Sequence, residues 1–307
     1  MGEGKGSEPA ATRCGFIALI GATNAGKSTL INALVGSKIA IVSHKVQTTR
    51  ALLRGIAMEG RSQLVFIDTA GLFAPKRRLD RAMVTAAWGV AHDADLACLL
   101  VDAKRGIDDE VAQIVEKLAE VRQPKVLVLN KIDLVEKPSL LALVARLNTD
   151  AAFEKTFMVS ALSGDGVHDL RRWLGARAPE GPWHYPEDQL TDAPLRHLAA
   201  EITREQLYRR LHQELPYQST VETEVWKQLK DGSVRIEQTI YVERESQRKI
   251  VLGKSGQGIK AIGAEARREI AAAVESPVHL FLFVKVREHW SDDPERYREM
   301  GLEFPQD

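Results

Sequence analysis

Two Gly-Lys-Ser triplets are the residues in this chain whose types and spacing most directly indicate chemistry. One lies in "GATNAGKST" (21–29) and the other in "LGKSGQGIK" (252–260). Glycine lets backbone N–H groups approach phosphate oxygens, lysine adds positive charge, and a serine hydroxyl can bind Mg²⁺. Both triplets therefore indicate phosphate binding, and the residues around them decide whether they do it in the same way.

The first triplet completes the pattern G-x-x-x-x-G-K-[ST] from Gly21 to Ser28. It follows the apolar run "FIALI" and begins the helical pattern "KSTLINALVG", the strand-to-helix context that a phosphate loop requires. We expect backbone N–H groups and the helix N-terminus to hold the phosphates. Lys27 is predicted to contact the β- and γ-phosphates and Ser28 to bind Mg²⁺.

A second motif, "DTAG" (68–71), follows the run "QLVFI". Asp68 would hold Mg²⁺ directly or through water, and Gly71 would donate its backbone N–H to the γ-phosphate. Leu72 follows where many GTPases carry the glutamine that orients the attacking water, so slow intrinsic hydrolysis is expected.

The motifs "NKID" (130–133) and "SAL" (160–162) follow the runs "KVLVL" and "TFMV". A carboxylate at Asp133 can accept hydrogen bonds from N1–H and the 2-amino group of guanine, and adenine offers neither donor. Each motif is weak alone, but the four in this order are specific for GTP binding. The predicted nucleotide-binding residues are Gly21, Ala22, Thr23, Asn24, Ala25, Gly26, Lys27, Ser28, Thr29, Asp68, Thr69, Ala70, Gly71, Asn130, Lys131, Asp133, Ser160, Ala161 and Leu162.

The loop "SHKVQTTR" (43–50) lies between the first two motifs and is predicted to be a switch, with Gln47, Thr48 and Thr49 at its centre. Thr49 is favoured over Thr48 as the third Mg²⁺ ligand beside Ser28 and Asp68. Arg50 is expected to be solvated or to face phosphate. For catalysis the sequence offers Lys27 and Asn24, the latter as a ligand for a monovalent cation such as K⁺ between the phosphates.

The second triplet has arginine at position 248, where a phosphate loop of the first kind needs glycine. Instead, "GKSG" (253–256) lies between two helical patterns, as in the G-x-x-G loop by which KH domains clamp about four nucleotides. Seven basic residues against two acidic ones between 244 and 268 support this reading. The predicted RNA-binding residues are Arg248, Lys249, Gly253, Lys254, Ser255, Gly256 and Lys260.

These motifs require two folded units. Five apolar runs alternate with helical patterns up to residue 178, which predicts an α/β domain with a mainly parallel sheet and its ligands at the carboxyl ends of the strands. We assign 1–14 to a disordered tail, 15–178 to the GTPase domain, 179–193 to a Pro-rich linker and 194–307 to an α+β domain with the order αββααβ.

Composition limits the expected partners and cellular location of the protein. The 42 basic and 42 acidic residues cancel, so any nucleic-acid surface must be local. Cys14 and Cys98 lie in buried-strand patterns, and no signal-peptide pattern or run of about 18 apolar residues is present. We expect a cytoplasmic monomer with reduced thiols, and peripheral membrane contact stays open.

Taken together, the phosphate loop, "QTTR", "DTAG", "NKID", "SAL" and "IVLGKSGQGIKAIGAEARREI" resemble the Era family of bacterial GTPases over nearly the whole chain after residue 14. The resemblance implies a Ras-like domain joined to a type II KH domain, GTP/GDP and Mg²⁺ as ligands, and the 3′ end of 16S ribosomal RNA and the small (30S) ribosomal subunit as partners. Thr23 and Ala70 stand where the family usually has proline, so loop rigidity and hydrolysis rate can differ.

Two alternatives are weighed against a GTP-driven switch. One is an RNA-binding scaffold whose nucleotide site is structural and turns over negligibly. The other is a tRNA-modifying GTPase, disfavoured because no additional catalytic cysteine or cofactor segment is found.

Overall fold

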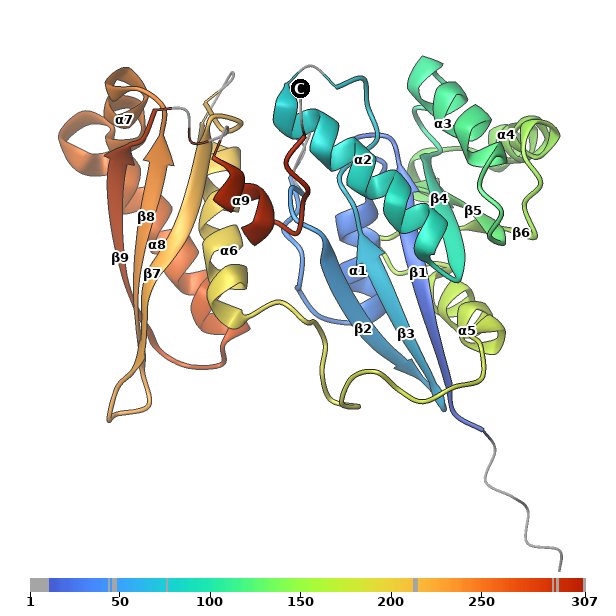
Figure 1. The fold of residues 1–307 in the computed structure, drawn as a ribbon, viewed down its shortest axis with the longest axis horizontal. Coiled ribbons are helices and arrows are strands. Elements are labelled where there is room, and N and C mark those ends of the chain that lie inside the picture. The colour runs from blue at the N-terminus through green and yellow to red at the C-terminus, as the bar shows by residue number, and fades with distance from the viewer. Residues whose placement is uncertain are drawn as a thin grey trace, which may run out of the picture.

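The computed structural model describes residues 11–43, 45, 49–75, 77–211, 215–288, 290 and 293–305. Figure 1 shows two units side by side, each built on its own sheet, with the linker running beneath them. The first unit has a sheet of six strands in the order β2-β3-β1-β4-β5-β6. These strands are β1 (Arg13–Gly21), β2 (Leu53–Glu59), β3 (Ser62–Asp68), β4 (Leu96–Asp102), β5 (Lys125–Asn130) and β6 (Lys155–Met158).

Helices cover both faces of this sheet, as a parallel sheet of apolar strands requires. On one face, α1 (Lys27–Val35) and α5 (Val167–Arg177) enclose a core with β1 and β3. On the other, α2 (Arg78–Asp93), α3 (Asp109–Ala119) and α4 (Lys137–Asp150) enclose a second core. A short 3₁₀ helix, η1 (Ile132–Leu134), follows β5. The predicted α/β fold is confirmed.

One strand of this sheet was not predicted from the sequence. β2 pairs antiparallel with β3, from Leu53 opposite Asp68 to Glu59 opposite Ser62. Its sequence "LRGIAME" lacks the continuous apolar run by which the other strands were recognised. β1 also begins at Arg13, two residues before the boundary that we assigned to the tail.

The linker lies against the first unit. Gln63 of β3 accepts backbone N–H groups of His184 and Tyr185 on its side-chain oxygen (2.9 and 3.0 Å) and donates its amide to the Tyr185 carbonyl (2.8 Å). Thr191 then forms a bridge with Gly55 of β2. These contacts tie the linker to the β2–β3 side of the sheet and so restrict the path by which the chain reaches the second unit.

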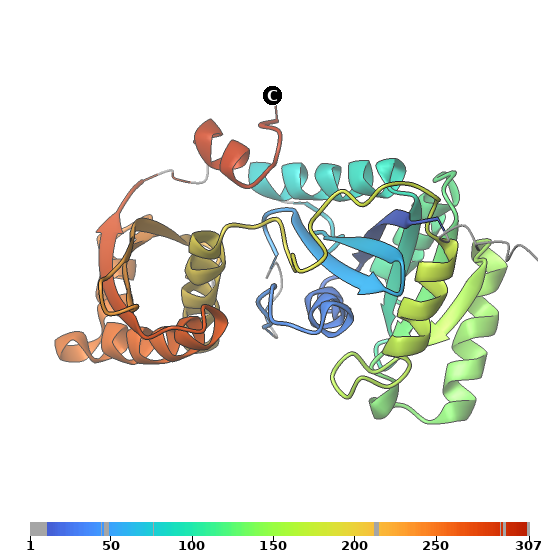
Figure 2. The same ribbon diagram turned by 90° about the horizontal axis from the view of Figure 1, so that it is seen from below.

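The second unit has the predicted order αββααβ. Its three-stranded sheet has the order β7-β8-β9, with β7 and β8 antiparallel and β8 and β9 parallel. The helices pack on one face of it, as the view from below shows (Figure 2). Its elements are α6 (Leu195–Arg210), β7 (Ser219–Gln228), β8 (Val234–Val242), α7 (Glu245–Leu252), the 3₁₀ turn η2 (Lys254–Gly256), α8 (Gln257–Ala273) and β9 (Val278–Val286).

After β9 the chain returns to the first unit. The short helix α9 (Pro294–Glu299) and the residues after it bring Tyr297 and Leu302 into an apolar cluster with Ala70 and Met83. The C-terminal segment therefore packs on the "DTAG" loop and on α2, a contact that sequence patterns gave no reason to expect. No helix among the described residues is long and apolar enough to cross a bilayer.

Candidate functional site

The phosphate loop connects β1 to α1 at the carboxyl end of the sheet. Gly26 caps α1 in the left-handed region, with φ 97°. A Cβ on Gly26 would also lie 2.2 Å from Nδ2 of Asn130, so both backbone conformation and space require glycine there. The loop thus leads directly into the N-terminus of α1, where backbone N–H groups without helical partners can bind phosphate.

Lys27 lies inside this loop. Its Nζ donates to the Gly21 and Ala22 carbonyl oxygens, both at 3.0 Å, and the residue is 6% exposed. Burial lowers the pKa of Lys27 to about 8, and the charge of Asp68 opposes this shift. A buried ammonium group held only by carbonyls is strongly stabilised by an arriving phosphate.

Three hydroxyl and carboxylate oxygens converge beside Lys27. Ser28 Oγ lies 3.0 Å from Thr49 Oγ1, and each of them donates to Asp68 Oδ2 at 3.0 Å. An octahedral Mg²⁺ site with bonds of about 2.1 Å has neighbouring oxygens roughly 3 Å apart. The three residues predicted as Mg²⁺ ligands are thus brought together at a spacing that suits this ion.

Asp68 provides an independent test of this fit. It is fully buried, and its Oδ1 has no hydrogen-bond partner. Burial raises the pKa of this carboxyl group, although Lys27 and the hydrogen bonds from Ser28 and Thr49 oppose the shift. A buried, unpartnered carboxylate oxygen is costly unless a cation or water completes its shell. The oxygen-only donor set is the one that a hard cation prefers.

The rest of "DTAG" packs against the phosphate loop. A Cβ on Gly71 would lie 2.8 Å from Thr23 Cα, so only glycine permits this close approach. Leu72 is 2% exposed and packs in the apolar core beside Ala22. It is not among the residues that line the nucleotide cavity, and an apolar side chain in the core cannot orient water.

Asn130 joins the base motifs to the phosphate loop. Its Nδ2 donates to the Ala25 carbonyl (2.9 Å), and its Oδ1 accepts the backbone N–H of Ala161 (3.0 Å). Lys131 donates to the Asn24 carbonyl (2.8 Å) and to Asp102 (2.6 Å). Asp133 is exposed and faces the cavity, where a base can reach it.

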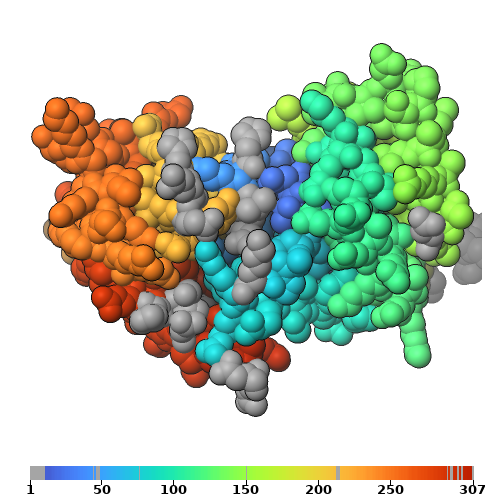
Figure 3. All heavy atoms as spheres, turned by 90° about the horizontal axis from the view of Figure 1, so that it is seen from above, coloured from blue at the N-terminus to red at the C-terminus, as the bar shows by residue number. Residues whose placement is uncertain are grey.

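These loops enclose one cavity of about 410 Å³. Fourteen of the predicted site residues line it, together with Ser43 of the predicted switch loop, and the sequence did not single out Ile41, Val42 and Leu134. The predicted residues on this wall are Thr23, Asn24, Gly26, Lys27, Ser28, Thr29, Thr49, Gly71, Asn130, Lys131, Asp133, Ser160, Ala161 and Leu162. In Figure 3 the part of the chain that contains the phosphate loop is blue. Blue atoms lie between the second unit and the green atoms of residues near 100–130.

The switch loop is described only in part, since Gln47 and Thr48 lie outside the described residues. Thr49 is in the position predicted for a Mg²⁺ ligand. Arg50 contradicts its prediction because it is neither solvated nor near phosphate. It is 6% exposed, and its guanidinium donates to Tyr208, Pro216, Tyr217 and Ser219 of the second unit.

The second triplet occupies a turn between α7 and α8. Gly253, Ser255 and Gly256 have φ of 69°, 51° and 76°. A Cβ on Gly253 would lie 2.8 Å from the backbone nitrogen of Gly258, and one on Gly258 would lie 2.7 Å from the Val251 carbonyl. Gly258, which the sequence reading missed, therefore helps to bring the two helix ends together, and the third glycine of "GKSGQG" was its only signal.

The predicted RNA-binding residues surround this turn. Lys249, Lys254, Ser255 and Lys260 are exposed. Arg248 already has two partners within the protein: it donates to the Val284 carbonyl of β9 (3.2 Å) and pairs with Glu245 (2.9 Å). Ile250 is 59% exposed on the same helix. Basic and apolar groups thus lie next to a glycine turn, as in surfaces that bind single-stranded RNA.

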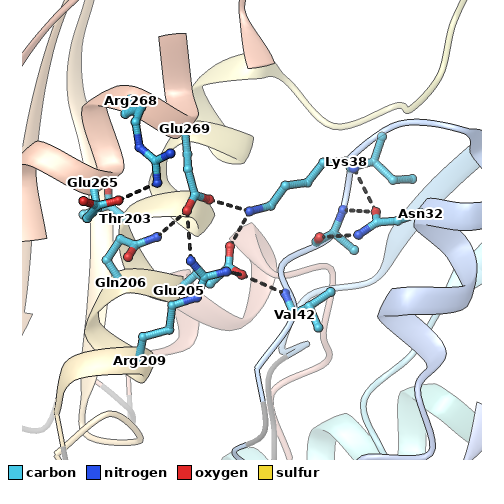
Figure 4. A network of polar contacts seen from close by, with 12 residues as sticks. Asn32, Lys38, Val42, Thr203, Glu205, Gln206, Arg209, Glu265, Arg268 and Glu269 are labelled. Atoms are coloured by element: carbon cyan, nitrogen blue, oxygen red, sulfur yellow. Dashed lines mark hydrogen bonds and ion pairs between the residues drawn. The ribbon is translucent and has the colours of Figure 1, made fainter. Parts of the chain in front are cut away.

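A polar network joins the two units (Figure 4). Lys38 follows α1 and donates to Glu205 of α6 and Glu269 of α8, both at 2.6 Å. The Glu205 side chain is 1% exposed, and its other oxygen accepts the backbone N–H of Val42 at 3.4 Å. Val42 itself lines the cavity, so this network reaches the nucleotide site.

The fold and the site define a class: a P-loop GTP-binding domain followed by a KH domain. Comparisons agree with this. Residues 16–131 match the family described as 50S ribosome-binding GTPase, and residues 214–291 match the KH domain. The chain is 71% identical over 296 residues to the GTPase Era of Afipia carboxidovorans, covering 96% of each chain. It is 66% identical over 294 residues to that of Rhizobium meliloti, covering 96% of this chain and 94% of the relative.

Solved structures give the same result. A crystal structure of Era in complex with MgGDPNP and nucleotides 1506–1542 of 16S ribosomal RNA matches with a TM-score of 0.89 at 34% identity, covering 94% of this chain and 99% of that one. An Aquifex aeolicus Era variant bound to GDP and AlF₄⁻ matches equally well. The chain belongs to the Era family of GTPases and is a GTP-hydrolysing enzyme. The resemblance and the two-part fold inferred from the motifs are confirmed.

Proposed function

We propose that this GTPase is a switch that binds the 3′ end of 16S ribosomal RNA through its KH domain and assists maturation of the small ribosomal subunit in the cytoplasm. The observation that carries the proposal is that one chain contains two different phosphate-binding motifs, the phosphate loop at 21–28 and the glycine turn at 253–256. It is supported by the solved relative that holds MgGDPNP and this part of the RNA. Residues 15–178 would serve GTP and 194–307 the RNA.

In the nucleotide site, Lys27 and the N–H groups of the phosphate loop bind and orient the phosphates. Asp133 accepts from the guanine base, while Asn130 holds the loops around it. Ser28, Thr49 and Asp68 would hold Mg²⁺, which would supply positive charge to neutralise the β- and γ-phosphates. Because Leu72 is buried in the core, water must be oriented by another group or by the backbone.

Asn24 is proposed as a ligand of a K⁺ ion that adds positive charge beside the phosphates. It lies in the phosphate loop with φ 61° and lines the cavity. GTP hydrolysis should then be faster in K⁺ than in Na⁺ at equal ionic strength, and the difference should vanish in Asn24→Ala. Equal rates in the two salts would exclude this role.

In the RNA site, the turn at residues 253–256 and the helices beside it clamp the sugar-phosphate chain. Lys249, Lys254 and Lys260 supply exposed positive charge around it. The side of α7 carrying Ile250 offers an apolar surface for an unstacked base.

The test is GTP hydrolysis with and without an RNA oligomer that matches the small-subunit 3′ end. Gly256→Asp is the variant of choice: a Cβ at Gly256 meets no atom within 4 Å, and aspartate tolerates the left-handed φ of 76° better than most residues. Gly232→Asp is the matched control: it has φ 82°, equally open space, and lies in the turn between β7 and β8.

RNA should bind to the wild type and to Gly232→Asp and stimulate their turnover. Both effects should be lost in Gly256→Asp, while the rate without RNA stays unchanged. RNA binding that persists in Gly256→Asp would overturn the assignment of the RNA site. RNA that binds the wild type without changing turnover would favour a scaffold over a switch.

A further inference from the structure

Thr49 and Arg50 are neighbours in the chain, yet their side chains serve different parts of the molecule. Thr49 Oγ1 lies 3.0 Å from both Ser28 Oγ and Asp68 Oδ2 in the nucleotide site. The Arg50 side chain enters the second unit and is buried there. Because a single peptide bond joins the two residues, the contacts that hold Arg50 restrict where the Thr49 side chain can lie.

Arg50 is held by a group of residues that we call the arginine socket, namely Tyr208, Pro216, Tyr217, Ser219 and Trp290. Nη1 donates to the Ser219 carbonyl at 2.9 Å. Nη2 donates to the Tyr208 hydroxyl (3.1 Å) and to the carbonyls of Pro216 (3.2 Å) and Tyr217 (3.0 Å). The Trp290 ring lies 5.5 Å from the guanidinium carbon.

The socket recognises the shape of arginine more than its charge. All four acceptors are neutral, and the Trp290 face adds a planar surface on which a guanidinium can stack. Burial lowers the pKa of Arg50, with Glu201 acting in the opposite direction and Arg204 in the same one. Because several acceptors surround a forked donor, lysine cannot reproduce these contacts.

A second cation from the same loop is bound at the same place. Lys45 donates to the carbonyl oxygens of Tyr208 and Leu211, at the C-terminal end of α6. Carbonyls at a helix C-terminus carry partial negative charge, so this position favours a cation. Lys45 and Arg50, on either side of residues 46–48, thus both attach the switch loop to the end of α6.

We propose that Arg50 is a positioning residue for GTP hydrolysis: the arginine socket of the second unit holds Thr49 against Ser28 and Asp68, so the KH domain completes the nucleotide site. The proposal rests on the proposed role of Thr49 as a Mg²⁺ ligand. It assigns the KH domain a direct part in hydrolysis that does not require RNA.

The experiment compares full-length wild type with Arg50→Met, Arg50→Lys and Tyr208→Phe, using GTP and Mg²⁺ without RNA. In Arg50→Met, kcat should fall by roughly ten- to a hundredfold, the loss typical of a displaced group. The Mg²⁺ concentration for half-maximal rate should rise, and KM for GTP should change less than kcat. Arg50→Lys should restore little of the rate, and Tyr208→Phe, which removes one acceptor, should lose less than Arg50→Met.

Arg54→Met is the matched control, because Arg54 also crosses from the first unit, pairing with Asp192 of the linker at 2.7 Å, but is not adjacent to Thr49. Its kcat should stay within about twofold of the wild type, since exposed ion pairs contribute little. GDP affinity and thermal unfolding report whether each variant is folded, and GDP affinity should be nearly unchanged in Arg50→Met.

Three results would overturn the proposal: wild-type kcat and Mg²⁺ dependence in Arg50→Met, a GDP affinity that falls in parallel with kcat, or an equal loss in Arg54→Met. The proposed function is tested by different measurements on the wild type. It fails if hydrolysis by the wild type does not depend on Mg²⁺ or if the wild type does not bind the RNA. The ratio of kcat between each variant and the wild type does not depend on whether RNA binds.

Discussion

Lys27 is the residue whose protonation should respond most to the nucleotide. Burial lowers its pKa to about 8 in the free protein. Bound phosphate favours the charged form and must raise that pKa, so nucleotide binding takes up a proton when Lys27 is partly neutral. Affinity for GDP should therefore fall as pH rises above 8, by up to about tenfold per pH unit.

The measurement is calorimetric titration with GDP in buffers of different ionisation enthalpy. At pH 8, uptake of about half a proton per nucleotide is expected, because the pKa of Lys27 is about 8. At pH 6.5, Lys27 is already charged and should contribute no uptake. Lys27→Met serves as the control, and the same uptake at pH 8 in that variant would assign the proton to another group.

Asp133 should determine which base is bound. It is exposed in the cavity and can accept two hydrogen bonds from guanine. Asp133→Asn replaces one acceptor oxygen by an amide donor, which fits the carbonyl of xanthine instead of the amino group of guanine. GDP affinity should fall by roughly a hundredfold, the scale of a lost hydrogen bond to a charged group, and XDP affinity should rise. Competition binding measures both, and unchanged GDP affinity would disprove the assignment.

Sequence predicts contacts within the nucleotide site better than contacts outside it. Asp68 ends β3, and Ser28 lies in the first turn of α1 after the loop that follows β1, so the topology alone brings them to one edge of the sheet. The position of Arg50 depends on α6 and on the α6–β7 connection, about 160 residues further along the chain. No local pattern specifies such a contact, and this is why Arg50 was misjudged.

At the scale of elements, the junction between α7 and α8 depends on Gly258 as much as on the predicted glycines. A Cβ at Gly258 would lie 2.7 Å from the Val251 carbonyl and 3.0 Å from that of Leu252. These are backbone atoms, so the helix ends would have to separate. Gly258→Ala should destabilise the KH domain by about 1–3 kcal/mol.

Gly263→Ala is the control for this substitution, since it lies in the same helix. There a Cβ meets only the end of Leu282, at 3.4 Å. Replacing glycine by alanine within a helix stabilises it by up to about 1 kcal/mol. Denaturant unfolding of both variants measures the difference, and equal midpoints would refute the role given to Gly258.

The elements that sequence failed to predict share a physical cause. β2 is an edge strand whose polar residues Arg54 and Glu59 pair with Asp192 and Arg171. The linker is held by Gln63, a polar residue fully buried in β3. In both cases polar side chains hold the segment in place by ion pairs or hydrogen bonds. The segment therefore lacks the apolar periodicity on which prediction from sequence depends. The strands with continuous apolar runs were all identified.

At the scale of the whole molecule, the second unit contacts both loops of the first that are proposed to sense the nucleotide. Arg50 and Lys45 of the switch loop bind Tyr208 and Leu211 at the end of α6, and Arg50 also binds Ser219 of β7. Ala70 of "DTAG" packs with Tyr297 and Leu302 of the C-terminal segment. A change at the γ-phosphate position can thus reach the KH domain by two routes, which satisfies the requirement that a ligand act through contacts that differ between states.

Lys38 offers the most direct test of this arrangement. It is the cation from the first unit that binds both Glu205 and Glu269, while Arg209 binds the same two carboxylates from within the second unit (Figure 4). Burial would raise the pKa of Glu269, but the hydrogen bonds and charges of Lys38 and Arg209 outweigh it and lower that pKa. Lys38→Met therefore leaves two acidic groups without their partner across the interface.

The population in which the two units separate should rise by roughly tenfold in Lys38→Met, because a charge-assisted hydrogen bond contributes about 1.5–3 kcal/mol. Distances between spin labels, one on each unit, would show a broader and longer distribution. Lys137→Met is the control, since Lys137 is an exposed cation at the start of α4. A distribution unchanged from wild type would mean that Arg50 and the C-terminal segment hold the units together without Lys38, because those contacts remain intact in this variant.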